Sequence, residues 1–101
     1  MIKHIVLFKM RDDIEVQQLS SELTAIRQGL LDLMGQVPTL KSIEVGINCN
    51  PVEKFHLSLI STHDDMEGLK AYAVHPLHRE VSKKIRAILD ERACNYFEFC
   101  V

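Results

Sequence analysis

The chain has 101 residues, of which 47% are hydrophobic and 26% are charged, and its formal net charge is −2 at pH 7. This size and composition are typical of one globular domain and exclude a disordered chain. No basic run appears, and the longest apolar runs are too short to cross a bilayer, so neither nucleic acid nor a membrane is an expected partner. Cys49, Cys94 and Cys100 form no C-x-x-C pair, which argues against a disulfide framework or a zinc site. We therefore predict a single cytoplasmic domain over residues 1–101.

The first part of the chain predicts a strand followed by an amphipathic helix. Apolar residues and His4 alternate over residues 2–10, with Ile5 and Leu7 on the opposite face from His4. Asp12 and Glu15 then form a capping-box pattern that predicts a helix start. A stripe at spacings of three and four follows, made of Val16, Leu19, Leu23, Ile26, Leu30 and Leu33. Gly35 and Pro38 supply the stop signals.

The second part of the chain predicts two strands, a broken helix and a last strand. Residues 40–49 and 55–62 are expected to be strands joined by a turn over 50–54. In the strand 55–62, His56, Ser58 and Ile60 share one face, while Leu57 and Leu59 share the other. A helix is expected to start at Asp64, and Pro76 is expected to end or kink it at His75. A second helix over 77–89 and a strand over 93–101 complete the chain.

The order β-α-β-β-α-β predicts an α+β, ferredoxin-like fold with a four-stranded antiparallel sheet and the helices on one face. Strands 2–10 and 55–62 are expected to be central neighbours that place His4, Val6, Phe8 and Ser58 toward the helices. An apolar patch would then remain on the open face of the sheet, formed by Ile5, Leu7, Leu57 and Leu59. Because such a patch usually marks an interface, we predict a homodimer whose two sheets pack face to face.

The segment "KAYAVHPLHREV" over residues 70–81 carries the candidate chemistry. The break at Pro76 can bring His78 back toward Tyr72, and histidine with tyrosine can perform acid–base chemistry on a carbonyl compound. The alternative is structural: His75 caps the second helix and Tyr72 is a core aromatic. The H-x-x-H spacing is a poor zinc pattern, because a helical zinc pair usually lies four residues apart. Both the catalytic and the structural interpretations remain open from the residues.

The opening "IKHIVLFK", the amphipathic first helix and "LKAYAVHPLHREV" together resemble the stress-responsive dimeric α/β-barrel (Dabb) family over essentially the whole chain. The resemblance implies a ferredoxin-like protomer and a dimeric barrel. Most members resemble small dimers without an established activity, but certain plant relatives are polyketide cyclases that close a ring by aldol condensation. Their catalytic roles map onto Tyr72 and His78, with His4, His56 and His75 in support.

The expected function follows from this resemblance and from the predicted layers. We expect a pocket between sheet and helices that binds a small apolar or carbonyl-containing molecule, without an organic cofactor. Its expected lining is Val6, Phe8, Ile26, Leu30, Ser58 and Val81. Ile26 and Leu30 are aliphatic where the cyclases have aromatic residues, so a different substrate is implied.

Two alternative activities and a cation site are also predicted. The first alternative is a cofactor-independent acid–base enzyme, a cyclase or lyase that uses Tyr72 and His78. The second is a cofactor-free monooxygenase, which rests on fold analogy and ranks last because no residue selects oxygen chemistry. The resemblance also implies Mg²⁺ or a similar cation near the end of the first helix, held by the backbone carbonyls of Met34, Val37 and Leu40.

Overall fold

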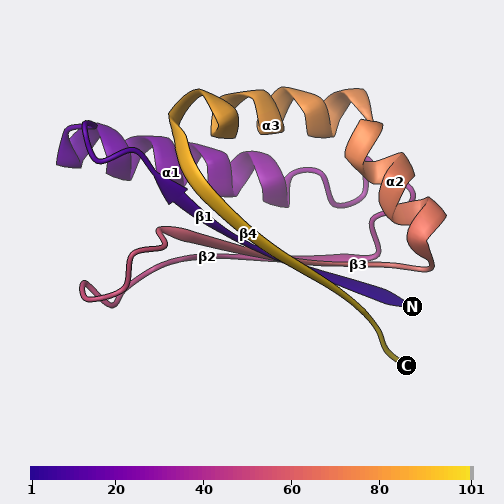
Figure 1. Ribbon diagram of the computed structural model, residues 1–101. Coiled ribbons are helices and arrows are strands. Elements are labelled where there is room, and N and C mark those ends of the chain that lie inside the picture. The colour runs from indigo at the N-terminus through magenta and orange to yellow at the C-terminus, as the bar shows by residue number, and fades with distance from the viewer. Residues whose placement is uncertain (101) are drawn as a thin grey trace.

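The computed structural model describes residues 1–100, which form a four-stranded sheet with the helices on one face (Figure 1). The elements in chain order are β1 (Ile2–Met10), α1 (Val16–Leu31), β2 (Ser42–Ile47), β3 (Leu57–His63), α2 (Met66–Val74), α3 (Pro76–Ile88) and β4 (Leu89–Glu98). The strands pair antiparallel in the order β2-β3-β1-β4, so β1 and β3 are the central strands. The predicted ferredoxin-like α+β fold is confirmed. None of the helices within residues 1–100 is long and apolar enough to span a membrane.

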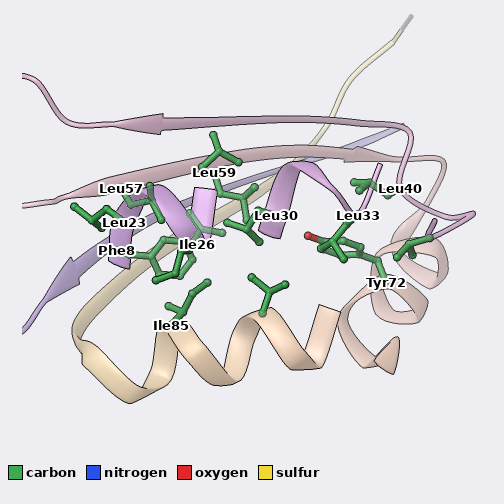
Figure 2. Packing of buried hydrophobic residues seen from close by; sticks show 14 of the residues in the cluster. Phe8, Leu23, Ile26, Leu30, Leu33, Leu40, Leu57, Leu59, Tyr72 and Ile85 are labelled. Carbon is green, nitrogen blue, oxygen red and sulfur yellow. The ribbon is translucent and has the colours of Figure 1, made fainter. Parts of the chain in front are cut away.

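Side-chain alternation along β1 puts its even-numbered residues under the helices. Val6 lies opposite Leu59 on β3 and Cys94 on β4, and Phe8 lies opposite Leu57. Directly opposed residues on antiparallel strands share a face. Leu57 and Leu59 are therefore in the core, where they are 1% and 3% exposed. Figure 2 shows both leucines beside the side chains of α1.

The predicted facing of the third strand was wrong. Ser58 and Ile60 lie opposite Leu7 and Ile5, so they belong to the open face and not to the helix side. Both alternating sets of residues in this strand contain apolar side chains, and a one-residue shift exchanges the two faces. The open face therefore keeps Ile5 and Leu7 from the predicted patch and gains Ile60.

Several predicted boundaries also move. Glu15, and not Asp12, is the N-cap of α1, because its carboxylate accepts hydrogen bonds from Gln17 N at 3.1 Å and Gln18 N at 3.2 Å. Asp65, and not Asp64, caps α2 through a bond from Gly68 N at 2.7 Å. β4 begins at Leu89, four residues before the predicted start at 93, and the predicted end of that strand, Val101, lies outside the described residues. The polar run over 90–92 hid this start, since it pairs as an edge strand with β1.

The helix break at Pro76 is confirmed. α2 ends at Val74, His75 is extended with φ −63° and ψ 135°, and Pro76 is the first residue of α3. Proline restricts the preceding residue to this extended region, and it fits the first turn of a helix because it lacks an N–H. The chain turns here, as Figure 1 shows, and α3 runs back over the sheet. This turn positions the candidate site.

Candidate functional site

A cavity of about 330 Å³ lies between the sheet and the three helices. Its apolar lining comes from Val6 and Phe8 on β1, Leu30 on α1, Leu59 on β3 and Ile85 on α3. Its polar lining comes from His4, Tyr72, His78, Ser82, Arg86, Arg92 and Tyr96. A mostly apolar hollow with a few polar groups is the usual form of a small-molecule site.

Tyr72 is the most enclosed polar residue of the cavity. Its side chain is 1% exposed, and its hydroxyl has no hydrogen-bond partner among residues 1–100. Figure 2 shows the hydroxyl oxygen directed from α2 into the space between the sheet and α3. Burial disfavours the phenolate and raises the pKa of Tyr72 to about 12, so the hydroxyl stays protonated and can donate.

His78 lies against Tyr72, with ring centroids 4.5 Å apart. Its Nδ1 is 3.0 Å from the carbonyl oxygen of Ala73 at the end of α2. Since a carbonyl only accepts, Nδ1 carries the proton of the neutral ring and Nε2 is left as an acceptor. Burial lowers the pKa of His78, with a smaller contribution from the positive charge of Arg86, so the neutral ring is favoured near pH 7.

His4 on β1 forms the wall next to β4. Its ring stacks on Tyr96 at 4.5 Å and its Nε2 is 3.0 Å from Cys94 Sγ, while its buried Nδ1 has no partner among residues 1–100. Burial lowers the pKa of His4 to about 4, and the positive charge of Arg92 adds to the effect. His4 is therefore a neutral, buried imidazole with one unused nitrogen.

Two of the histidines named from the sequence have structural contacts away from the cavity. His75 Nδ1 accepts a hydrogen bond from Leu77 N at 3.1 Å and caps α3. His56 Nδ1 accepts a hydrogen bond from Met10 N at 2.9 Å, at the end of β1. Neither residue lines the cavity. The structure thus brings together Tyr72, His78 and His4, and it separates His56 and His75 from them.

Three of the six residues in the predicted pocket lining reach the cavity. Val6, Phe8 and Leu30 line the cavity, whereas Ile26 and Val81 are buried in the core beside it. Val81 packs against α1, where a Cβ added to Gly29 would lie 3.4 Å from Val81 Cγ2. The expectation for Ser58 was wrong, because Ser58 lies on the opposite face of the sheet.

The sequence interpretation missed several residues at the site. Ser82 and Arg86 follow His78 at intervals of four, so the helical period could have placed all three on one face of α3. His63 was missed because the strand was expected to end at residue 62. His63 is fully buried, donates from Nδ1 to Thr39 O at 2.8 Å and contacts Ser61 Oγ through Nε2 at 3.0 Å. The ring centroids of His63 and Tyr72 are 5.0 Å apart, so His63 packs against the Tyr72 side chain.

The backbone carbonyls that were predicted to bind a cation lie in the segment after α1. Gly35 adopts a φ of 87° there, which glycine tolerates best. The carbonyl of Val37 already accepts a hydrogen bond from Leu40 N at 3.1 Å and keeps one further lone pair. Residues 1–100 contain no cluster of three histidine, cysteine, aspartate or glutamate side chains suited to a metal ion. A cation held by carbonyls of Met34, Val37 and Leu40 stays a prediction from the family resemblance.

The same fold occurs in enzymes of low sequence identity. Hydroxynitrile lyase from Passiflora edulis is 15% identical with a TM-score of 0.76, over 95% of this chain and 90% of that chain. An antibiotic biosynthesis monooxygenase is 12% identical with a TM-score of 0.78, over all of both chains. These likenesses concern the fold alone.

Closer relatives show the family. A dimeric protein of unknown function with a ferredoxin-like fold, from Bacteroides fragilis, is 36% identical with a TM-score of 0.94, over 97% of this chain and 95% of that chain. A stress-response A/B barrel domain-containing protein of Arabidopsis thaliana is 30% identical over an alignment of 93 residues, and the match covers 88% of this chain and 78% of the relative. The family model of the stress-responsive A/B barrel domain matches residues 2–99. The chain therefore belongs to the stress-responsive A/B barrel domain (Dabb) family.

Proposed function

We propose that this protein binds a small, largely apolar carbonyl compound in the cavity between sheet and helices. The proposal rests on Tyr72, which lines the cavity. Its hydroxyl is buried and has no hydrogen-bond partner among residues 1–100. An unsatisfied buried hydroxyl costs roughly 1–3 kcal/mol, which a ligand carbonyl that accepts its hydrogen bond would recover. The apolar side chains around it suit the hydrocarbon part of such a ligand.

A bulky side chain at Ala73 should obstruct the cavity and abolish ligand binding. Ala73 is exposed and lines the cavity, so Ala73→Trp is expected to prevent binding of the probe 2-octanone, measured by ligand-detected NMR. Val74→Trp is the matched control, since Val74 is exposed and does not line the cavity. Tyr72→Phe should weaken binding about fivefold through loss of one hydrogen bond. Binding of 2-octanone that persists unchanged in Ala73→Trp and Tyr72→Phe would reject the proposal.

An acid–base activity at the same site is a second candidate, favoured by the tautomer of His78. With Nδ1–H bonded to Ala73 O, the unprotonated Nε2 can take a proton from the carbon next to the ligand carbonyl. The electron pair of that C–H bond then moves onto the carbonyl oxygen, where the Tyr72 hydroxyl donates a hydrogen bond to the enolate. Return of the proton from His78 to the oxygen gives the enol, whereas its return to the carbon regenerates the ketone with exchange of that hydrogen, and neither step needs a cofactor.

The open face of the sheet supports a homodimer. Ile5 and Ile60 lie opposite each other in the middle of this face and Leu7 lies beside them, and all three are partly exposed in the single chain. Contiguous apolar groups at such a position usually mark an interface. The Bacteroides fragilis relative, at 36% identity, is described as dimeric. We therefore propose a dimer in which two copies bury this face.

A charge placed on the open face should separate the dimer. Ile60→Asp is expected to give a folded species of 11.6 kDa in sedimentation velocity, where the wild type sediments at about twice that mass. Val52→Asp is the matched control, because Val52 is an exposed apolar residue in the β2–β3 connection. A wild-type chain that sediments as a monomer at micromolar concentration would contradict the proposed interface.

A further inference from the structure

Two arginines line the exposed side of the cavity. Arg86 on α3 and Arg92 on β4 are both exposed, in contrast to the buried Tyr72 at the inner end. Arg86 Nη1 donates to Ser82 Oγ at 2.9 Å, and Arg92 Nη2 lies 3.7 Å from Cys94 Sγ. Neither arginine forms an ion pair with a carboxylate within residues 1–100. The guanidinium groups therefore keep free donors at the cavity mouth.

No carboxylate lines the cavity to balance these charges. The cavity residues include no aspartate or glutamate among residues 1–100. The positive charges also act inside the cavity: Arg92 helps to lower the pKa of His4, and Arg86 that of His78. A cleft with one sign of charge and low-dielectric walls concentrates ligands of the opposite sign.

The buried side of the cavity offers a neutral donor. The Tyr72 hydroxyl is buried without a partner among residues 1–100, and burial raises the pKa of Tyr72 to about 12, so the group stays protonated. His4 also lines the cavity, but its Nε2 contacts Cys94 Sγ at 3.0 Å, the same sulfur that Arg92 Nη2 approaches at 3.7 Å, so His4 lies near Arg92. The remaining walls are apolar and include Val6, Leu59 and Ile85. The cavity thus combines a buried neutral donor, apolar walls and exposed cationic groups.

We infer that the ligand is an anionic amphiphile: a small apolar acid with its carboxylate at Arg86 and Arg92 and an oxo or hydroxyl group at Tyr72. This inference rests on the proposed ligand-binding function of the cavity and adds the charge and polarity of the ligand. A guanidinium binds a carboxylate through strong, charge-assisted hydrogen bonds, and an inner carbonyl or hydroxyl satisfies the unpartnered hydroxyl. An uncharged ketone uses only the second of these contacts.

A matched pair of probes tests whether the negative charge of the ligand strengthens binding. Calorimetric titration with 7-oxooctanoate and with its methyl ester compares ligands that differ in the negative charge and keep the chain and the inner ketone. We expect the wild type to bind the acid about tenfold more tightly than the ester at low salt. Raising the ionic strength should reduce this preference, because the arginines are exposed.

Variants that remove the two positive charges test whether the arginines cause the tighter binding of the acid. The double variant Arg86→Gln, Arg92→Gln is expected to bind the acid and the ester with equal affinity. Arg79→Gln is the control, since Arg79 is exposed on α3 and does not line the cavity, and it should keep the preference. Octanoate, which lacks the oxo group, should bind more weakly than 7-oxooctanoate in the wild type.

The outcomes separate the inference from the proposed function. Equal binding of acid and ester by the wild type overturns the anionic ligand and leaves a neutral carbonyl ligand in place. A preference that survives in the double variant overturns the role of the arginines. Failure of both probes and of 2-octanone to bind rejects the ligand-binding function, and the anionic ligand with it.

Discussion

Replacing His78 with alanine is expected to slow proton exchange at the carbon next to a ketone by about 100-fold or more, if the cavity acts as an acid–base site. A positioned general base typically contributes 10²–10⁴ in rate. His78 meets the requirements for this role because its Nδ1 is tied to Ala73 O at 3.0 Å and its pKa is lowered by burial. Tyr72→Phe should slow exchange less, since it removes only the donor to the carbonyl oxygen.

Deuterium incorporation into 2-octanone in D₂O, followed by proton NMR, measures this rate without knowledge of the natural substrate. His75→Asn is the matched control: it removes an imidazole that does not line the cavity and keeps a side chain suited to cap α3. The wild-type rate should fall only at a pH below the usual titration range of histidine, because burial lowers the pKa of His78 and protonation of His78 removes the base. Equal rates for wild type, His78→Ala and buffer would rule out catalysis of this proton transfer.

Acidification is expected to destabilise the fold through His4. The pKa of His4 is about 4 in the folded protein, against about 6.5 for an unperturbed histidine, because the ring is 8% exposed and lies near Arg92. Between these two values the unfolded chain binds more protons than the folded one, so stability is present above pH 6.5 and is lost as the pH falls toward 4. The contribution of His4 between pH 7.5 and pH 5 amounts to about 1–2 kcal/mol, after allowance for screening by solvent at the cavity.

Urea unfolding at pH 7.5 and pH 5, monitored by circular dichroism, measures this loss. His63 and His78 also have pKa values lowered by burial, so their protonation adds to the destabilisation of the wild type. His4→Gln isolates the first contribution, since glutamine does not titrate and fits a similar space. The variant should lose less stability than the wild type over the same pH interval. An identical loss in both proteins would show that His4 is not held neutral by the fold.

Local patterns in the sequence were sufficient for the elements and their order. The stripe that includes Leu23, Ile26 and Leu30 predicted α1, and the alternation over residues 2–10 predicted β1. Pro76 predicted the break between α2 and α3 because its ring acts directly on the preceding residue. These features depend on residues within a few positions in the sequence, so they can be predicted without the tertiary structure. The family followed from the same motifs, over residues 2–99.

The sequence predicted the site residues that the break positions and those that alternation along β1 places under the helices, such as His4 and Val6. Tyr72 and His78 flank Pro76 in the sequence, and their rings meet because the chain turns between α2 and α3 at this point. Arg92 and Tyr96 reach the same cavity from β4, and no local spacing connects them to Tyr72. His56 and His75 were grouped with the site by residue type, whereas each is bonded to a backbone N–H elsewhere.

The sequence alone therefore determined the order of the helices and strands, how they connect and that the helical segment breaks at Pro76. Only the tertiary structure decided which face of β3 meets the helices, because both alternating sets contain apolar residues and the choice depends on pairing with β1. That same pairing put Leu59 in the cavity wall and left Ser58 and Ile60 on the open face. The cavity itself was decided by packing, since its volume depends on how far side chains from α1, α2, α3 and the sheet fill the space between them.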